Sequence, residues 1–106
     1  MSIRSEEFFN DLVRTILVAS KDGSLLRAFL YDLLTPAERQ EIAARLQIIE
    51  QLNEGVSQTE IAKNLKVGVA TVTRGARTLL NPKGGFNRIL EKRGSWRPSV
   101  QRASAA

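Results

Sequence analysis

The hydrophobic residues of this chain recur at intervals of three and four, and no segment shows the alternation that a half-buried strand requires. Two dense stripes lie near the start of the chain, separated by a turn cluster at residues 21–23. The first stripe comprises Phe8, Phe9, Leu12, Val13, Ile16 and Leu17, and the second comprises Leu25, Leu26, Phe29, Leu30 and Leu33. This periodicity predicts an all-α fold, a small multi-helix domain.

The two stripes carry more apolar surface than one small core readily buries. A compact monomer of 106 residues, 42% of them hydrophobic, would leave much of that surface uncovered. An ordinary core face is one interpretation, and an intertwined or helix-swapped homodimer is the other. We expect the homodimer.

Two capping boxes mark further helix starts. The stretch "TPAE" at 35–38 offers a threonine cap, a proline at the first helical position and a glutamate that can bond back to the cap. The helix that follows should end at Gly55, and the second box, "SQTE" at 57–60, should begin another. The residues expected to point inward from these two helices are Ile42, Leu46, Ile49, Leu52, Ile61 and Leu65.

The rest of the chain divides at glycines. Gly68 should break the helix that starts at 58, a fifth helix should run from Val69 to about Leu80, and "NPKGG" at 81–85 is a stop signal. A short helix from Phe86 to about Arg93 should close a helical domain of residues 1–93. Residues 94–106 are predicted to be a disordered basic tail, in which Trp96 is either incidental or docks on the body or a partner.

Residues 58–77 have the pattern of a helix-turn-helix. Such a unit needs a small residue where its helices nearly touch, apolar inner faces and a turn that admits left-handed backbone. Ala62 is the small residue and Gly68 lies in the turn, whereas Lys66 stands where glycine is commonest and leaves the register open by one residue. The predicted inner wedge is Ile61, Leu65, Val67 and Val72.

Charge favours DNA as the partner of this unit over an αα-corner with no DNA contact. Residues 1–62 hold six Lys or Arg against ten Asp or Glu, and residues 63–106 hold ten against one. The basic half could be only a solvated tail, but four of its cations, Lys63, Lys66, Arg74 and Arg77, fall in or beside the motif.

The predicted DNA contacts divide into two groups. Gln58, Thr59 and Lys63 should hold phosphates together with backbone amides, while Val69, Ala70, Thr71 and Thr73 should enter the major groove, with Arg74 and Arg77 further along the helix. These small groove residues suggest contacts with thymine methyls, bridging waters and DNA shape.

Several classes of function are excluded by residue types. The chain has no cysteine and no histidine, which removes disulfides, the usual zinc sites and His-based catalysis. No paired catalytic carboxylates, activated nucleophile or phosphate loop is present, so we expect neither an enzyme nor a cofactor. No apolar run approaches membrane-spanning length, and we expect a soluble, cytoplasmic protein.

Residues 34–80 closely resemble the tryptophan repressor family. The shared motifs are "LTPAER" at 34–39, Arg45, "GVSQTEIA" at 55–62 and "GVATVTRGARTL" at 68–79. The resemblance implies an intertwined, all-helical homodimeric repressor that binds a palindromic operator when it is loaded with L-tryptophan. Asp32 and Ala62 depart from the family pattern, which suggests a changed operator.

The resemblance also implies a ligand site. The indole ring would lie between the guanidinium groups of Arg45 and Arg74, an arrangement suited to an aromatic ring. Thr35 would assist the carboxylate, the backbone near Leu34 would hold the ammonium group, Gly75 would let the ring approach, and Thr78 would meet the ammonium group or its water.

Three hypotheses follow from the sequence. The first is a sequence-specific repressor activated by L-tryptophan, and the second is a constitutive DNA-binding module or a repressor with a different small effector. The third, a purely structural dimer, would require the basic second half to be incidental. In the second hypothesis Arg45 could simply pair with Glu38 or Glu41, and Arg74 could contact phosphate alone.

Overall fold

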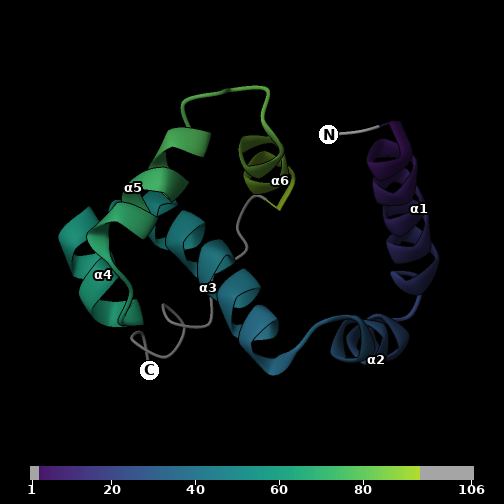
Figure 1. The fold of residues 1–106 in the computed structure, drawn as a ribbon. Helices are drawn as coiled ribbons and strands as arrows, with labels where there is room; N and C mark the ends of the chain where they lie inside the picture. Colours follow the sequence, from purple (N-terminus) through teal and green to yellow (C-terminus); the bar gives the residue numbers. More distant parts are fainter. Residues whose placement is uncertain (1–2, 94–106) are drawn as a thin grey trace. The chain divides into compact units, whose positions relative to one another are not determined.

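The computed structural model describes residues 3–93, and all of the regular structure in that range is helical (Figure 1). The helices are α1 (Ile3–Ala19), α2 (Gly23–Leu33), α3 (Pro36–Asn53), α4 (Gln58–Leu65), α5 (Val69–Thr78) and α6 (Gly85–Arg93). The prediction of an all-α fold is therefore confirmed. The predicted tail and Trp96 lie outside the described residues.

The capping box that starts α3 forms both of its hydrogen bonds. The backbone N–H of Glu38 donates to Thr35 Oγ1 at 3.2 Å, and the backbone N–H of Thr35 donates to Glu38 Oε1 at 2.9 Å. Hydrogen bonding of the Glu38 carboxyl to Thr35, through the Thr35 backbone N–H first and its side chain second, holds the pKa of that carboxyl below its ordinary value. The predicted capping box is therefore complete.

The boundaries of α4 and α5 fall where the capping residues place them. Ser57 Oγ accepts the backbone N–H of Glu60 at 3.2 Å and starts α4. Contrary to our prediction, Gly68 does not end this helix. Lys66 ends it in a left-handed conformation with φ 56° and ψ 45°, and Gly68 caps the start of α5.

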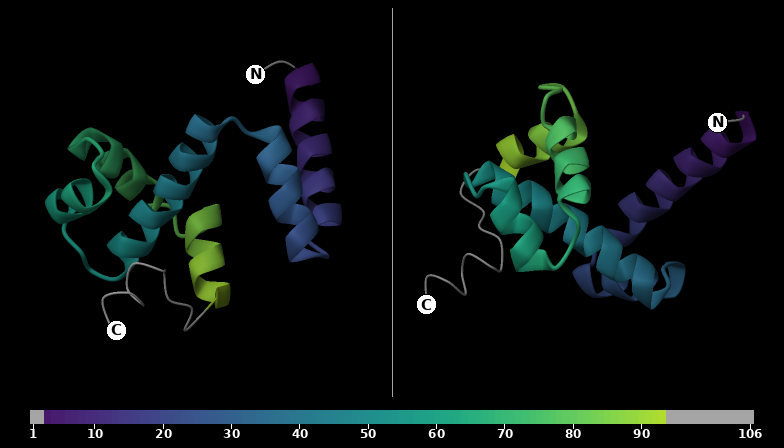
Figure 2. Two further views of the ribbon diagram at one scale, coloured as in Figure 1. Left: turned by 90° about the horizontal axis from the view of Figure 1, so that it is seen from below. Right: turned by 60° about the vertical axis from the view of Figure 1, so that its left-hand side comes forward.

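The described chain forms two compact units, divided between Gln40 and Glu41. In the first unit, α1 and α2 pack against each other as a hairpin, visible in the left view of Figure 2. Ala19 is the one buried hydrophobic side chain among the described residues of this unit. Phe8, Phe9 and Leu17 remain 54% to 61% exposed, so most of the apolar stripe of α1 has no cover within the hairpin.

The second unit contains the core. Its buried residues are Ile48, Ile61, Ala62 and Val72, and the half-buried Leu52, Val56, Leu65 and Val67 pack against them. The predicted wedge between α4 and α5 is confirmed. The prediction that Ile42 and Leu46 point into the core is wrong, because the buried part of α3 is residues 48–51, where Ile48 rather than Ile42 faces α4 and α5.

Candidate DNA and ligand site

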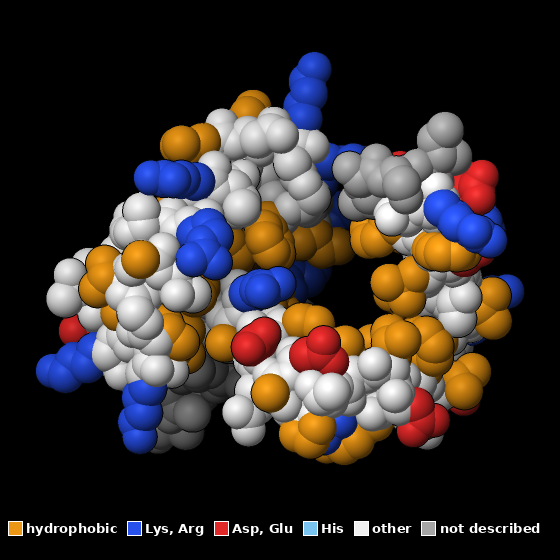
Figure 3. All heavy atoms as spheres, viewed as in Figure 1, with side chains coloured by type: hydrophobic (Ala, Val, Ile, Leu, Met, Phe, Trp, Pro, Cys, Tyr) orange, Lys and Arg blue, Asp and Glu red, His pale blue; other side chains and the backbone are white. Residues whose placement is uncertain are grey.

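The helix-turn-helix consists of α4, a turn at residues 66–68 and α5. Its two helices pack directly on each other, and the small Ala62 is buried where they meet. The four cations predicted to face phosphate, Lys63, Lys66, Arg74 and Arg77, are all exposed. Figure 3 shows Lys and Arg side chains in blue spread over the α4 and α5 region, where acidic side chains are sparse. This surface suits a polyanion.

The start of α5 is the part of the unit that would enter a major groove. Val69 and Ala70 are exposed there, as predicted. Thr71 and Thr73 are half-buried rather than exposed. Thr73 Oγ1 donates to Gln58 Oε1 at 2.7 Å, which ties α5 to the first residue of α4.

The front of α4 presents the residues predicted to hold phosphates. Thr59 and Lys63 are exposed, and Gln58 is half-buried because it accepts the hydrogen bond from Thr73. The first-turn amides of α4 add donors beside them, of which the Glu60 N–H is taken by the Ser57 cap. The bond between Gln58 and Thr73 fixes the phosphate-facing end of α4 relative to α5.

A cavity of about 340 Å³ lies between α3, α5 and α6, and we call it the arginine cavity. Its lining residues are Arg45, Ile48, Ile49, Thr71, Arg74, Gly75, Thr78 and Phe86. Four of the six residues that the resemblance assigned to the ligand are thus brought together from two helices. A volume of this size is at the lower end of the range of small-molecule sites, roughly 300 to 1,000 Å³.

Neither arginine of the cavity is engaged by a carboxylate. Among residues 3–93 the ion pairs join Arg14 to Asp11 and Arg93 to Glu50, so Arg45 pairs with neither Glu38 nor Glu41. Both guanidinium groups are exposed at the cavity, and Arg45 and Arg74 also line a neighbouring hollow with Glu41, Ala44 and Val67. The two cations are therefore available to a ligand or to phosphate.

Helix packing requires glycine at position 75, in addition to the ligand-binding role predicted for it. A Cβ atom built at this position would lie 2.8 Å from Ile48 Cγ2, closer than side chains tolerate. Glycine therefore lets α5 pack closely against α3 at this point. Thr78, one turn later, donates its hydroxyl to the Gly75 carbonyl at 2.6 Å and keeps its lone pairs for another partner.

The remaining two predicted ligand residues lie in the first unit. Thr35 uses its hydroxyl to cap α3, and the Leu34 carbonyl accepts a hydrogen bond from Arg39 Nη1 at 3.0 Å. Arg39 also stacks on the Tyr31 ring, with its guanidinium carbon 4.0 Å from the ring centroid. A ligand ammonium group at Leu34 would share this carbonyl with Arg39.

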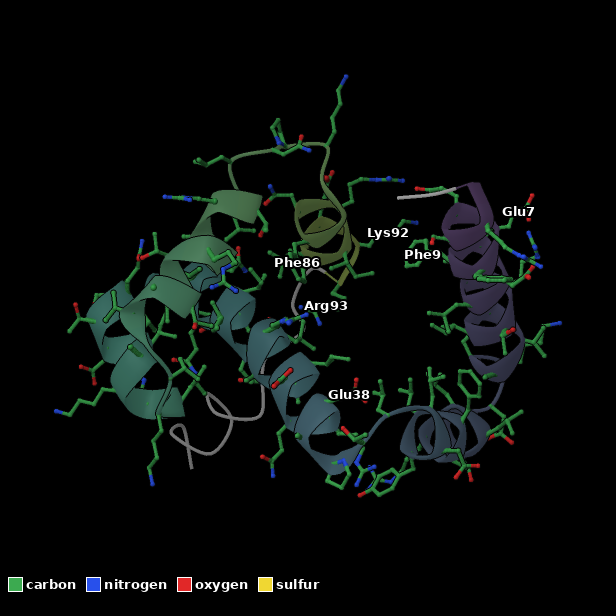
Figure 4. All side chains as sticks on the ribbon, viewed as in Figure 1. Glu7, Phe9, Glu38, Phe86, Lys92 and Arg93 are labelled. Carbon is green, nitrogen blue, oxygen red and sulfur yellow. The ribbon has the colours of Figure 1, made fainter. Side chains whose placement is uncertain are left out.

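Sequence reasoning missed three residues that shape the cavity. Phe86 supplies its one aromatic side chain, and Glu50 and Arg93 form an ion pair that joins α3 to α6. Figure 4 shows Phe86 and Arg93 on the side of α6 that faces α3. A glutamate inside the run "QIIEQL" carries no signal that it is buried, yet Glu50 is 2% exposed and pairs with Arg93 of α6.

Residues 3–93 contain no group of three His, Cys, Asp or Glu side chains placed to hold a metal ion. In the same range no helix is long and apolar enough to cross a membrane.

Comparison with known proteins assigns the family. The family described as Trp repressor protein matches residues 7–94. The chain is 42% identical to the Trp operon repressor homolog of Actinobacillus succinogenes and 40% identical to that of Mannheimia succiniciproducens, in each case over 72% of this chain and 75% of the relative. It is 43% identical to the Photobacterium profundum homolog, over 65% of this chain and 64% of that protein.

The family match extends beyond the helix-turn-helix into both units, and the relatives are Trp operon repressor homologs. With the α4–turn–α5 geometry and the pair of arginines behind it, they lead to one conclusion. The chain belongs to the Trp repressor protein family.

Proposed function

We propose that this protein is an operator-specific repressor that L-tryptophan activates as corepressor, and that it works as a homodimer. The observation that carries the proposal is the position of two exposed arginines at one cavity: Arg45 on α3 and Arg74 on α5. One arginine belongs to the helix that forms the core, and the other belongs to the helix that would enter the major groove.

The lining of the arginine cavity suits an aromatic amino acid. Guanidinium groups stack on aromatic rings and also bind carboxylates, so Arg45 and Arg74 can recognise both ends of such a ligand. Ile48 and Ile49 offer an apolar floor, which favours an uncharged ring over a charged side chain. Thr78 supplies a hydroxyl beside them, and Gly75 lies in the lining because its lack of a side chain lets α5 pack closely on Ile48.

Ligand and DNA would be coupled through α5. In the ligand-bound protein, a ring beside Arg45 and Arg74 fills the space between α5 and α3 and fixes the position of α5. In the ligand-free protein, α5 is free to tilt toward the cavity. The start of α5 carries Val69 and Ala70, so a change in its tilt moves the groove-facing surface directly. In a dimer the two copies must meet major grooves about one helical turn apart, roughly 34 Å, and small tilts break that match.

The dimer rests on the first unit. Many large apolar side chains of α1 and α2 are exposed, and a second copy of the chain would cover them; they are Phe8, Phe9, Val13, Leu17, Val18, Leu25, Tyr31 and Leu33. A twofold dimer also presents two copies of α5, which is what a palindromic operator requires.

Calorimetry with the common amino acids tests the ligand assignment. We expect L-tryptophan to bind the free protein with one site per chain, and Arg45→Leu to abolish that binding. Lys63→Ala is the matched control, since Lys63 is an exposed cation of α4 away from the cavity, and it should bind tryptophan as the parent does. If the protein binds another amino acid and not tryptophan, that amino acid is the effector. If it binds none of them, the protein is a constitutive DNA-binding module.

A further inference from the structure

Helix α6 closes one end of the arginine cavity, although no part of α6 was among the residues predicted to bind ligand. Phe86, the second residue of α6, lines this cavity together with Arg45 and Arg74. We propose that Phe86 is the residue that sets which ligand the cavity accepts. This inference rests on the proposed function, because it assigns specificity to the same ligand site.

Phe86 separates two cavities. On its other side lies a larger cavity of about 640 Å³, lined by Thr78, Asn81, Gly84, Gly85, Phe86 and Ile89. Thr78 and Phe86 are the two residues shared by both linings, and Phe86 is the larger of them. Gly84 and Gly85, which directly precede Phe86 in the chain, have no side chain that could take its place. Without the phenyl ring the arginine cavity would open into the space beside α6.

Helix α6, which carries Phe86, is held in place at both of its ends. Next to Phe86, the Asn87 side-chain amide donates to the Leu79 carbonyl at 3.0 Å and to the Asn81 carbonyl at 2.9 Å. At the other end of α6, Arg93 pairs with Glu50 of α3, whose side chain is 2% exposed. The start of α6 is thus tied to the end of α5, and its end is tied to α3. Phe86 is therefore a fixed wall of the cavity.

A fixed aromatic wall selects a ligand by size and polarity. Together with Ile48 and Ile49 it supplies the large apolar side chains of the lining, beside the two arginines. A flat ring fits against the phenyl group, a charged side chain loses hydration there without a partner, and a ring with a bulky substituent meets the wall. The class of ligand is an amino acid with an unsubstituted aromatic side chain.

Calorimetry on the full-length protein tests the assignment, with L-tryptophan and 5-benzyloxy-L-tryptophan as probes. We expect the parent to prefer tryptophan. Phe86→Ala should bind tryptophan about 10-fold more weakly because the ring loses an apolar contact. It should bind the benzyloxy analogue more tightly than the parent, because the substituent can enter the adjoining cavity. The ratio of the two affinities should change by more than about 10-fold.

Ile89→Ala is the control for this experiment, since Ile89 lies on the same helix and lines only the neighbouring cavity. It should keep the parent's ratio. If the parent binds neither probe, the proposed ligand site fails; if the parent binds tryptophan and Phe86→Ala keeps the parent's ratio, the role of Phe86 is overturned. Should Phe86→Ala unfold, as judged by its thermal melt, Phe86→Leu must still shift the ratio in the same direction, and an unchanged ratio overturns the inference.

Discussion

Lys66 holds a backbone conformation that few residues other than glycine adopt. Its φ of 56° places it in the left-handed region, and it is the one described non-glycine residue with positive φ. The position ends α4 and aims the chain into α5, so the sharp crossing of the two helices depends on it. The turn of the DNA-binding unit thus holds an exposed cation in a conformation that costs some stability.

Lys66→Gly should therefore stabilise the protein. We expect the free energy of unfolding to rise by about 0.5 to 1 kcal/mol, because relief of the left-handed strain exceeds the extra chain entropy of glycine. Lys63→Gly is the matched control within the helix and should lower stability by about 1 kcal/mol. Urea unfolding measures both. If Lys66→Gly instead lowers stability as much as its control does, the left-handed turn at 66 is not the conformation of the protein.

Gly75 should resist enlargement by a single methyl group. A Cβ atom there would come 2.8 Å from Ile48 Cγ2, and both residues lie at the contact of α5 with α3. We expect Gly75→Ala to cost about 1 to 3 kcal/mol of stability, since overpacking outweighs the better helix propensity of alanine.

A second substitution tests the cause of that loss. Ile48→Leu moves the branch away from Cβ and removes the clashing methyl group, so Gly75→Ala with Ile48→Leu should cost less than the sum of the two single changes. Thermal unfolding of the four proteins gives the coupling. Strict additivity would show that the two side chains do not meet.

At the scale of the helices, an ion pair joins the end of α6 to α3. Glu50 is 2% exposed and its partner Arg93 is 22% exposed at the side chain, so removal of the arginine leaves a charge in the core without its cation. We expect Arg93→Ala to destabilise the protein by about 3 kcal/mol. It should also weaken ligand binding, although Arg93 does not line the arginine cavity, because Phe86 loses its support.

The double substitution Glu50→Leu with Arg93→Leu distinguishes the contribution of the two charges to stability from the contribution of side-chain packing. With both charges gone and apolar volume kept, most of the lost stability should return. Chemical denaturation is the measurement. A double variant as unstable as Arg93→Ala would mean that the charges are not the cause.

The helix starts and contacts that depend on residues close together in the sequence could be predicted from it. The starts of α3 and α4 follow from capping boxes whose hydrogen bonds involve residues three apart, and the wedge between α4 and α5 follows from short-range apolar spacing. The position of α6 was not predictable. Its placement depends on Arg93 reaching Glu50, forty-three positions earlier in the chain, and no local pattern encodes that contact. Phe86 was missed as a cavity residue for the same reason.

The exposure of Ile42 and Leu46 has a related cause. Their spacing marks one face of α3, but within the second unit the buried residues of that helix are confined to 48–51. Periodicity indicates which side chains share a face and does not tell how far along the helix a partner extends. These two exposed side chains add to the apolar surface that a second copy would cover.

For the whole molecule, the exposed apolar stripe of α1 predicts an obligate homodimer. Phe9 and Leu17 are 54% and 61% exposed, and no core of this size is stable with such a face in water. Phe9→Asp and Leu17→Asp should abolish the dimer and with it the folded state. Asn10→Asp, an exposed position on the same helix, adds the same charge and should be tolerated. Sedimentation that finds a folded monomer of the parent at low micromolar concentration would refute the dimer.

In the proposed repressor, Arg74 couples the ligand to the DNA. Its most direct test is a titration of a duplex operator, selected from a random pool, with and without saturating L-tryptophan. Coupling between sites is typically about 1 to 3 kcal/mol, so tryptophan should raise operator affinity by about 5- to 150-fold, and the operator should raise tryptophan affinity equally. Arg74→Leu should lose the response and part of the basal affinity, whereas Thr78→Val should weaken the response and keep basal binding. Equal operator affinities with and without tryptophan in the parent protein would contradict the account.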